Sequence, residues 1–262
     1  MDFFSRLPPP VMVIIASLFT WSITALGAAV VFLFKSVNKK TLDAMLGLSA
    51  GVMIAASFWS LIAPAIDLCG TLGYNKWMIP AAGFVTGGLF ILAVAVFLDK
   101  KISSENSKGM KGNILLVTSI TMHNIPEGLA VGVGFGGFAL GIPGCTLISA
   151  MMIALGIGIQ NFPEGTAVSV PLLKGGTKRF KAFFIGQASG FVEPISAILG
   201  YFLTMAIRSI LPFLLTFSAG AMIAVVSNEL LPDGGKENKN ICTLGCIFGF
   251  VIMMILDVAL TF

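Results

Sequence analysis

Residues 123–128 read HNIPEG, and residues 160–165 read QNFPEG. Each segment places amide, carboxylate and proline residues inside a long, mostly apolar run. An ionisable side chain costs about 2.5–3.5 kcal/mol when it is inserted at the centre of a lipid bilayer, so such a residue marks a functional site by default. These two segments therefore decide how the rest of the chain is interpreted.

The composition points to a membrane protein. Hydrophobic residues make up 56% of the 262 residues and charged residues only 11%, whereas about a quarter of an ordinary soluble domain is charged. Eight apolar runs are long enough to cross about 30 Å of hydrocarbon at about 1.5 Å per residue. They are approximately Val11 to Phe34, Leu42 to Ile66, Trp77 to Leu98, Asn113 to Gly137, Gly144 to Leu173, Ala182 to Ile207, Ile210 to Leu231 and Ile241 to Phe262. The sequence thus predicts an all-α integral membrane protein with eight transmembrane helices in a single domain, residues 1–262.

The basic residues predict the orientation. Thirteen of the sixteen Lys and Arg residues fall in alternate connections between the apolar runs, and only Arg6, Lys76 and Arg208 fall in the other set. Because cytoplasmic loops are enriched in Lys and Arg, we expect both termini to lie outside the cytoplasm. The basic residues form no extended basic face, so nucleic acid is not an expected partner.

Two pairs of similar segments indicate an internal repeat. Residues 49–55 read SAGVMIA and residues 218–224 read SAGAMIA, on helices that the predicted topology runs in opposite directions. The two Pro-Glu-Gly segments also lie on oppositely directed helices. Many transporters are built from inverted repeats, with the substrate site near the centre of the membrane.

The spacing of the polar residues predicts a metal site. Side chains three or four residues apart share a helix face, so the segment at 123–128 presents an imidazole, an amide and a carboxylate together, and the segment at 160–165 presents two amides and a carboxylate. A further glutamate lies in the sixth apolar run. Three carboxylates this close repel one another, and a divalent cation is the simplest neutralising partner. The predicted ligands are His123, Asn124, Glu127, Gln160, Asn161, Glu164 and Glu193.

Prolines beside these residues add backbone oxygens to the predicted site. A proline inside a helix removes the hydrogen bond to the carbonyl four residues earlier. Unsatisfied backbone in a membrane is tolerated only against protein, water or a bound ion. The prolines are Pro126, Pro163 and Pro194, and the carbonyls belong to Met122, Ile159 and Gly190.

The donor types narrow the substrate and exclude several enzymes. Oxygen and imidazole donors without thiolates suit zinc, iron(II), manganese or cadmium, and the four scattered cysteines are expected to act as apolar packing residues. The single histidine cannot complete the His-Glu-x-x-His motif of a zinc protease or the paired Glu-x-x-His helices of a di-iron oxidase. No enzyme and no resident cofactor are therefore expected. The alternative is a transporter of small organic solutes, or of another cation, that uses the same carboxylate cluster.

The paired segments, together with Glu193-Pro194, resemble the signatures of the ZIP metal transporter family, and specifically its GufA-like branch. The resemblance implies a 3+2+3 bundle, an elevator-like movement of the motif-bearing helices against the second and seventh helices, and metal flow toward the cytoplasm across the plasma membrane. It also implies two ions: His123, Glu127, Gln160 and Glu164 surround one, while Asn124, Asn161 and Glu193 join the bridging glutamates around a second. Zinc is the expected substrate, with cadmium, iron(II) and manganese as alternatives, and a homodimer is one assembly open to such a protein.

The chain departs from the family pattern in two ways: the connection between the third and fourth helices contains no histidine, and Asn161 stands where some relatives have an acidic residue.

Other polar residues near helix ends suggest a route for the ion. Asp67 and Asp257 are expected near the outer ends of their helices. The inner candidates are Asp99, Asn228 and Glu229, of which the adjacent pair is the preferred exit.

Overall fold

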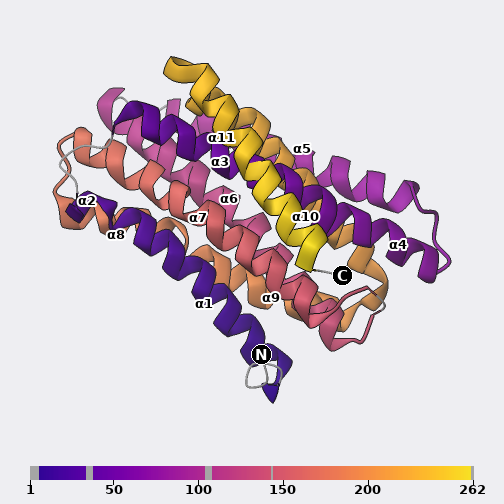
Figure 1. Ribbon diagram of the computed structural model, residues 1–262. Coiled ribbons are helices and arrows are strands. Elements are labelled where there is room, and N and C mark those ends of the chain that lie inside the picture. The colour runs from indigo at the N-terminus through magenta and orange to yellow at the C-terminus, as the bar shows by residue number, and fades with distance from the viewer. Residues whose placement is uncertain (1–5, 34–37, 104–107, 143, 261–262) are drawn as a thin grey trace.

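The chain folds into a bundle of long helices (Figure 1). A computed structural model describes residues 6–33, 38–103, 108–142 and 144–260, without the side chains of 98–103, 108–120, 122, 123, 174, 208 and 260. Over these residues all of the regular elements are helices, as predicted. They are α1 (Pro9–Ala28), α2 (Val30–Leu33), α3 (Lys39–Ala56), η2 (Ser57–Ile62), α4 (Ala63–Thr71), α5 (Met78–Ser103), α6 (Lys108–Ala139), α7 (Leu147–Lys174), α8 (Arg179–Ser189), α9 (Val192–Ala206), η3 (Arg208–Ile210), α10 (Leu211–Val225), η4 (Val226–Leu230) and α11 (Leu231–Leu260).

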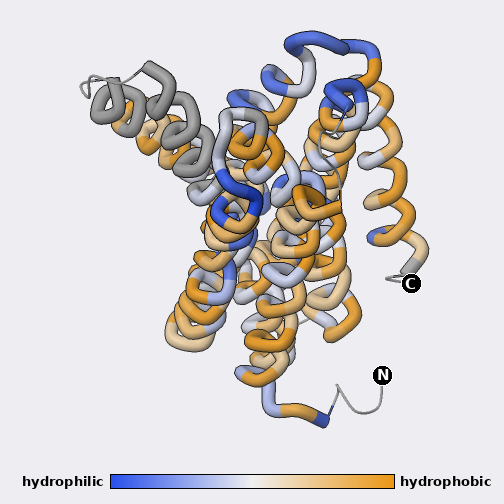
Figure 2. The backbone as a smooth tube through the Cα atoms, turned by 90° about the vertical axis from the view of Figure 1, so that its left-hand side faces the viewer, coloured by the Kyte–Doolittle hydropathy of each residue, from blue (hydrophilic) through white to orange (hydrophobic). Residues whose placement is uncertain are grey.

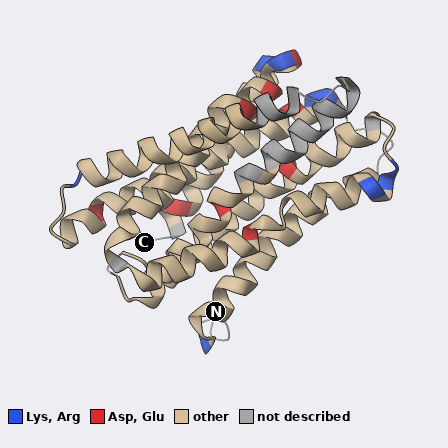
Figure 3. Ribbon diagram, turned by 180° about the vertical axis from the view of Figure 1, so that it is seen from behind, with Lys and Arg blue, Asp and Glu red and all other residues tan. Residues whose placement is uncertain are grey.

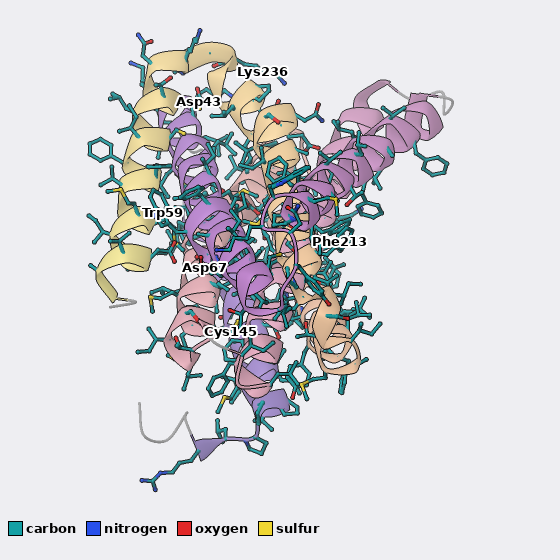
Figure 4. The ribbon with its side chains drawn as sticks, turned by 90° about the vertical axis from the view of Figure 1, so that its right-hand side faces the viewer. Asp43, Trp59, Asp67, Cys145, Phe213 and Lys236 are labelled. Atoms are coloured by element: carbon teal, nitrogen blue, oxygen red, sulfur yellow. The ribbon has the colours of Figure 1, made fainter. Side chains whose placement is uncertain are left out.

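Most of the length of the helices is made of hydrophobic residues (Figure 2), and many large apolar side chains are exposed. Within the described residues, six helical stretches are long and apolar enough to cross a membrane. The last of them, Leu211–Ala259, contains 49 residues. Its backbone is not helical at Asn238, where φ is −128° and ψ is 62°, and the chain turns back there close to the labelled Lys236 (Figure 4). The long apolar stretches and the exposed apolar side chains together identify an integral membrane protein.

Four helix pairs form the bundle, and they fall into two groups. In the first group α1 packs on α7 and α6 packs on α9, with α8 against α7 and α1; we call these five helices the motif unit. In the second group α3 packs on α11 and α10 packs on α5; we call these four helices the support unit. The two units meet where α3 packs on α7 and where α10 packs on α6.

Glycines allow the helices of each pair to approach closely, as small residues commonly do in membranes. A Cβ atom at Gly165 would overlap the carbonyl oxygen of Thr24 on α1, and one at Gly128 would overlap the carbonyl oxygen of Glu193 on α9. The glycine that ends each Pro-Glu-Gly segment is thus the point at which a neighbouring helix contacts the motif helix. The sequence alone did not predict this role.

Two π-helical segments, η2 and η4, interrupt the helices of the support unit. Each begins eight residues after the first serine of its seven-residue repeat, at Ser57 and at Val226. Each is followed within two residues by a proline, Pro64 or Pro232, which cannot donate a backbone hydrogen bond to the preceding turn. The runs predicted as Leu42 to Ile66 and Ile210 to Leu231 are therefore not regular α-helices throughout, and both deviate at the same place in the repeat.

The run predicted as a single helix from Ala182 to Ile207 is broken. Helix α8 ends at Ser189, and α9 begins at Val192. The prediction that the carbonyl of Gly190 is free is wrong, because it accepts a hydrogen bond of 3.0 Å from the backbone N–H of Glu193. A tight turn between the helices, rather than a proline kink inside one helix, places Glu193 in the first turn of α9.

Charged residues are distributed unevenly along the bundle (Figure 3). Lys and Arg lie at its ends, whereas several Asp and Glu residues lie within the helices. Figure 4 shows Asp43 and Lys236 toward one end and Asp67 and Cys145 toward the other, which is also the end of the N-terminus. The acidic residues in the interior are therefore the groups that need an explanation.

Candidate metal centre

Six of the seven predicted ligands are buried where the helices of the motif unit meet. Their exposed fractions are 0 or 1%, although five of them occupy the middle of long apolar helices. The two from α6 are Asn124 and Glu127, the three from α7 are Gln160, Asn161 and Glu164, and the one from α9 is Glu193. The seventh, His123, belongs to α6, but its side chain lies outside the described residues.

Helices α6 and α7 are joined by a direct hydrogen bond between the two motifs. The amide nitrogen of Gln160 donates to Oε1 of Glu127. Asn124 points in a different direction, because its amide nitrogen donates to the carbonyl oxygen of Ser189 at 2.8 Å, at the end of α8. The structure therefore brings Gln160 and Glu127 together, as predicted. The hydrogen bond of Asn124 instead stabilises the end of α8, where the chain turns into α9.

Glu193 is held by uncharged donors. The amide nitrogen of Asn161 lies 2.9 Å from both carboxylate oxygens of Glu193 and 3.1 Å from the carbonyl oxygen of Thr20. The hydroxyl of Thr24 donates to Oε1 of Glu193 at 3.4 Å. Thr20 and Thr24 are one helical turn apart on α1, and no feature of the sequence connected them with Asn161 or Glu193.

Glu164 is contacted from the support unit. The hydroxyl of Ser49 on α3 donates to its Oε1 at 2.9 Å, and Ser49 is completely buried. Ser49 begins the repeated seven-residue segment, so the repeat was the signal that could have identified it. The sequence predicted an internal repeat there, but no contact with Glu164.

Several oxygen atoms of this cluster have no hydrogen-bond donor. Among the described residues, none donates to Oδ1 of Asn124, Oε2 of Glu127, Oε1 of Gln160 or Oδ1 of Asn161. Buried polar atoms nearly always have a partner, and an unpartnered one calls for an explanation such as an ion. Four buried acceptors from two facing helices form a site that is rich in oxygen and short of donors, as cation binding requires.

The charges of the cluster favour a cation as well. Glu127 lies close enough to Glu164 and Glu193 for their charges to repel its own. The salt bridges found in the described part of the chain, Lys39–Asp43 and Lys236–Asp233, lie elsewhere. Within the described residues no three His, Cys, Asp or Glu side chains are grouped closely enough to hold a metal ion by themselves. An ion bound by the described residues would therefore need the amide oxygens as well as the carboxylates.

A separate pocket of about 440 Å³ brings together two of the predicted pathway residues. Asp67 and Asp257 both line it, together with Ser60 and Ser149. Oδ1 of Asp257 accepts a hydrogen bond of 2.7 Å from Ser60, whereas Oδ2 has no donor among the described residues. Asp67 and Trp59, which also lines the pocket, are labelled in Figure 4.

The predicted inner residues are not brought together in the same way. Asn228 is exposed and Glu229 is partly buried, and both belong to the π-helical segment η4. Asp99 belongs to α5, but its side chain lies outside the described residues. The assignment of these three residues to an exit route stays a prediction.

Comparison with known proteins identifies the family. The family model described as "ZIP Zinc transporter" matches residues 99–257, a region that contains both Pro-Glu-Gly segments and Glu193. The chain is 37% identical to the zinc transporter ZIP11 of Xenopus tropicalis, with 96% of this chain and 98% of that protein covered. The chain belongs to the ZIP zinc transporter family. ZIP proteins are transporters, so the chain is not an enzyme.

Two bacterial ZIP proteins are also similar over most of their length. The zinc transporter GufA of Myxococcus xanthus is 34% identical, with 94% of this chain and 98% of that protein covered. The zinc transporter ZIPB of Bordetella bronchiseptica is 36% identical, with 90% of this chain and 77% of that protein covered. The predicted resemblance to the ZIP family, including GufA, is confirmed.

Proposed function

We propose that the protein transports a divalent metal ion, zinc in preference to others, across the plasma membrane toward the cytoplasm. Membership of the ZIP family and the printed names of its relatives support zinc as the substrate. The observation that carries the proposed site is the set of buried, donor-free oxygen atoms on α6 and α7. Such atoms are stabilised when a cation takes the place of the missing donors.

The proposed primary site lies between α6 and α7. Its ligands are His123, Glu127, Gln160 and Glu164. Two carboxylates would balance the charge of one divalent ion, and nitrogen and oxygen donors without thiolates suit zinc. One histidine with several oxygens holds zinc less tightly than a structural cage of cysteines and histidines, which suits an ion that has to be released.

A second ion would be bound by Asn124, Asn161 and Glu193 with the bridging glutamates. We propose that this second site stays largely empty as long as residue 161 is an asparagine. The amide of Asn161 supplies hydrogen bonds to both oxygens of Glu193. These bonds already satisfy the carboxylate, so an ion has less to gain there than at Glu127. An aspartate at position 161 would remove the donor and add a negative charge.

Asn161→Asp is therefore expected to raise the zinc stoichiometry of the purified protein from about one ion to about two. The measurement is equilibrium dialysis with metal analysis in detergent at matched free zinc. Asn75→Asp makes the same chemical change at an exposed turn outside the candidate metal centre, where the side-chain oxygen accepts from the backbone N–H of Trp77, and it serves as a control that should not raise the stoichiometry. A stoichiometry unchanged by Asn161→Asp would contradict the proposal that Asn161 keeps the second site empty.

The proposed topology has eight membrane-spanning helices in a 3+2+3 arrangement, with both termini outside the cytoplasm. The turn at Asn238 divides the last apolar stretch into two passes, and α6 has the length of a further pass. The two π-helical segments at matching positions support an inverted repeat. In this orientation the pocket with Asp67 and Asp257 lies on the outer side, and we propose that ions enter through it.

Purified protein in liposomes is expected to carry zinc inward along a zinc gradient, measured with an indicator dye trapped inside. A competition series of zinc, cadmium, iron(II) and manganese on one preparation ranks the substrates, and vesicles of known sidedness give the direction. Protein-free liposomes are the control. Transport of none of the four metals would contradict the proposal and favour a transporter of small organic solutes.

A further inference from the structure

A single hydroxyl connects the support unit to a carboxylate of the candidate metal centre. Ser49 on α3 donates to Oε1 of Glu164 on α7 at 2.9 Å, across the contact between the two units. Both side chains are buried, with exposed fractions of 0 and 1%. A hydrogen bond to a charged group is stronger than one between neutral groups, so this bond stabilises one relative position of the two units.

Ser218 occupies the equivalent position in the other half of the molecule. It begins the second seven-residue segment, on α10, and α10 packs on α6 as α3 packs on α7. Its exposed fraction is 1%, but its hydroxyl has no hydrogen-bond partner among the described residues. The carboxylate equivalent to Glu164 is Glu127, whose Oε2 also lacks a donor among the described residues. One of two equivalent serine–glutamate pairs is therefore formed, while both members of the other keep an unsatisfied atom.

We propose that Ser49 and Ser218 hold the motif unit alternately, one in each of the two conformations of the transport cycle. In the conformation seen here Ser49 holds Glu164. In the opposite conformation Ser218 donates to Glu127, and Ser49 releases Glu164. This proposal rests on the proposed transport function, because it assumes that the motif unit moves against the support unit. Both serines are positioning residues, which act through the glutamates that bind the ion.

The exchange has a physical advantage. Leaving a buried hydroxyl and a buried carboxylate unpaired is costly, so a mechanism that broke one bond without forming another would trap the protein in a single conformation. When an equivalent bond forms as the first one breaks, the two conformations remain similar in free energy. A ligand or a mutation then needs only a modest differential effect to shift their populations.

The experiment measures these populations directly in zinc-free protein. Spin labels are attached through a keto amino acid in place of Lys178, at the start of α8 in the motif unit, and of Glu237, at the turn into the last pass of the support unit. Both positions are exposed, and this chemistry leaves the four cysteines unchanged. Pulsed electron–electron double resonance then gives the distance between the two labels, and so between the units, in each conformation.

Ser49→Ala is expected to reduce the population that matches the present structure by about tenfold, because one hydrogen bond to a charged group is lost from that state alone. Ser218→Ala is expected to reduce the other population by a similar factor. The double variant is expected to return the ratio to within about threefold of the original value. A merely structural role for the serines would not produce opposite shifts that cancel.

The matched control is Ser57→Ala, which removes a buried serine hydroxyl of η2 that donates to the carbonyl of Met53 within its own chain segment. It should leave the ratio unchanged. Ser49→Thr and Ser218→Thr, which keep a hydroxyl, should restore the original ratio and provide a second test if an alanine variant folds poorly. Shifts of both alanine variants in the same direction, or no shift in either, would overturn the proposal.

This outcome is separable from that of the proposed function. The distances are measured without zinc, so opposite shifts in the two serine variants would support the alternating contacts even if the liposomes carried no zinc. Zinc transport with unchanged distance populations would reject the alternating contacts and leave the transport function standing.

Discussion

Glu127→Gln and Glu164→Gln are each expected to reduce zinc uptake by at least about 100-fold. Loss of a residue that merely supports a metal ligand already costs about 10–100-fold in affinity or activity, and these two glutamates are proposed to contact the ion directly. Glutamine keeps the shape of the side chain and removes the charge. The effect therefore reports on charge balance, and the alanine variants, which remove the whole group, are expected to abolish uptake.

The glutamine variants should remain folded. Each removes one of the charges that repel one another in the buried cluster, so the zinc-free protein should be at least as stable as the original. Zinc at about 100 times its dissociation constant stabilises a binding protein by about 2.7 kcal/mol. Thermal unfolding in detergent should show this gain for the original protein and not for either variant.

The control for both measurements is Asp233→Asn. Asp233 is partly exposed, forms a 2.6 Å ion pair with Lys236 at the end of the bundle, and lies outside the candidate metal centre. Its loss should leave uptake and the zinc-dependent stabilisation unchanged. Normal zinc uptake by both glutamate variants would rule out the proposed primary site.

Gly165→Ala is expected to have the second largest effect, a loss of folded protein. The added Cβ would overlap the carbonyl oxygen of Thr24 and lie 2.9 Å from the backbone nitrogen of Ala28, so α1 would have to move away from α7. Overpacking of a well-packed interior costs about 1–3 kcal/mol, and backbone atoms cannot turn aside as a side chain can. Gly128→Ala should act in the same way at the contact between α6 and α9.

Gly235→Ala is the control, because no atom outside its immediate neighbourhood lies within 4 Å of a Cβ placed there. The fraction of monodisperse protein and the midpoint of thermal unfolding should fall for Gly165→Ala and Gly128→Ala, and should stay the same or rise for Gly235→Ala. Original stability in both motif variants would show that these glycines serve only to loosen the motif helices after proline.

Much of the candidate site could be predicted because it depends on local spacing. The positions of Asn124 and Glu127, three residues apart in an uninterrupted helix, follow from helix geometry. The approach of Gln160 to Glu127 followed from the match between the two segments. The sequence placed Asp67 and Asp257 only near the outer ends of their helices, and the structure shows that both line one pocket.

The parts that the sequence missed depend on helix packing. The partners of Glu193 include Thr24, 169 residues earlier in the chain, and Ser49 precedes Glu164 by 115 residues. The periodicity of a helix says which of its residues share a face, but the neighbour of that face is chosen by the packing of the whole bundle. The break after α8 was missed because a proline near a helix start and a proline inside a helix have the same local sequence signal.

The sequence by itself determined that this protein lies in a membrane, that it is helical, and that two polar segments share one chemistry. Run length, charge and residue spacing are local properties, and the bilayer imposes them on any chain that crosses it. Only the tertiary structure decided which donors the buried carboxylates receive, where glycine lets two backbones meet, and which of the two equivalent serines is engaged. Those features depend on the relative position of helices far apart in the chain, which is also the quantity that a transport cycle must change.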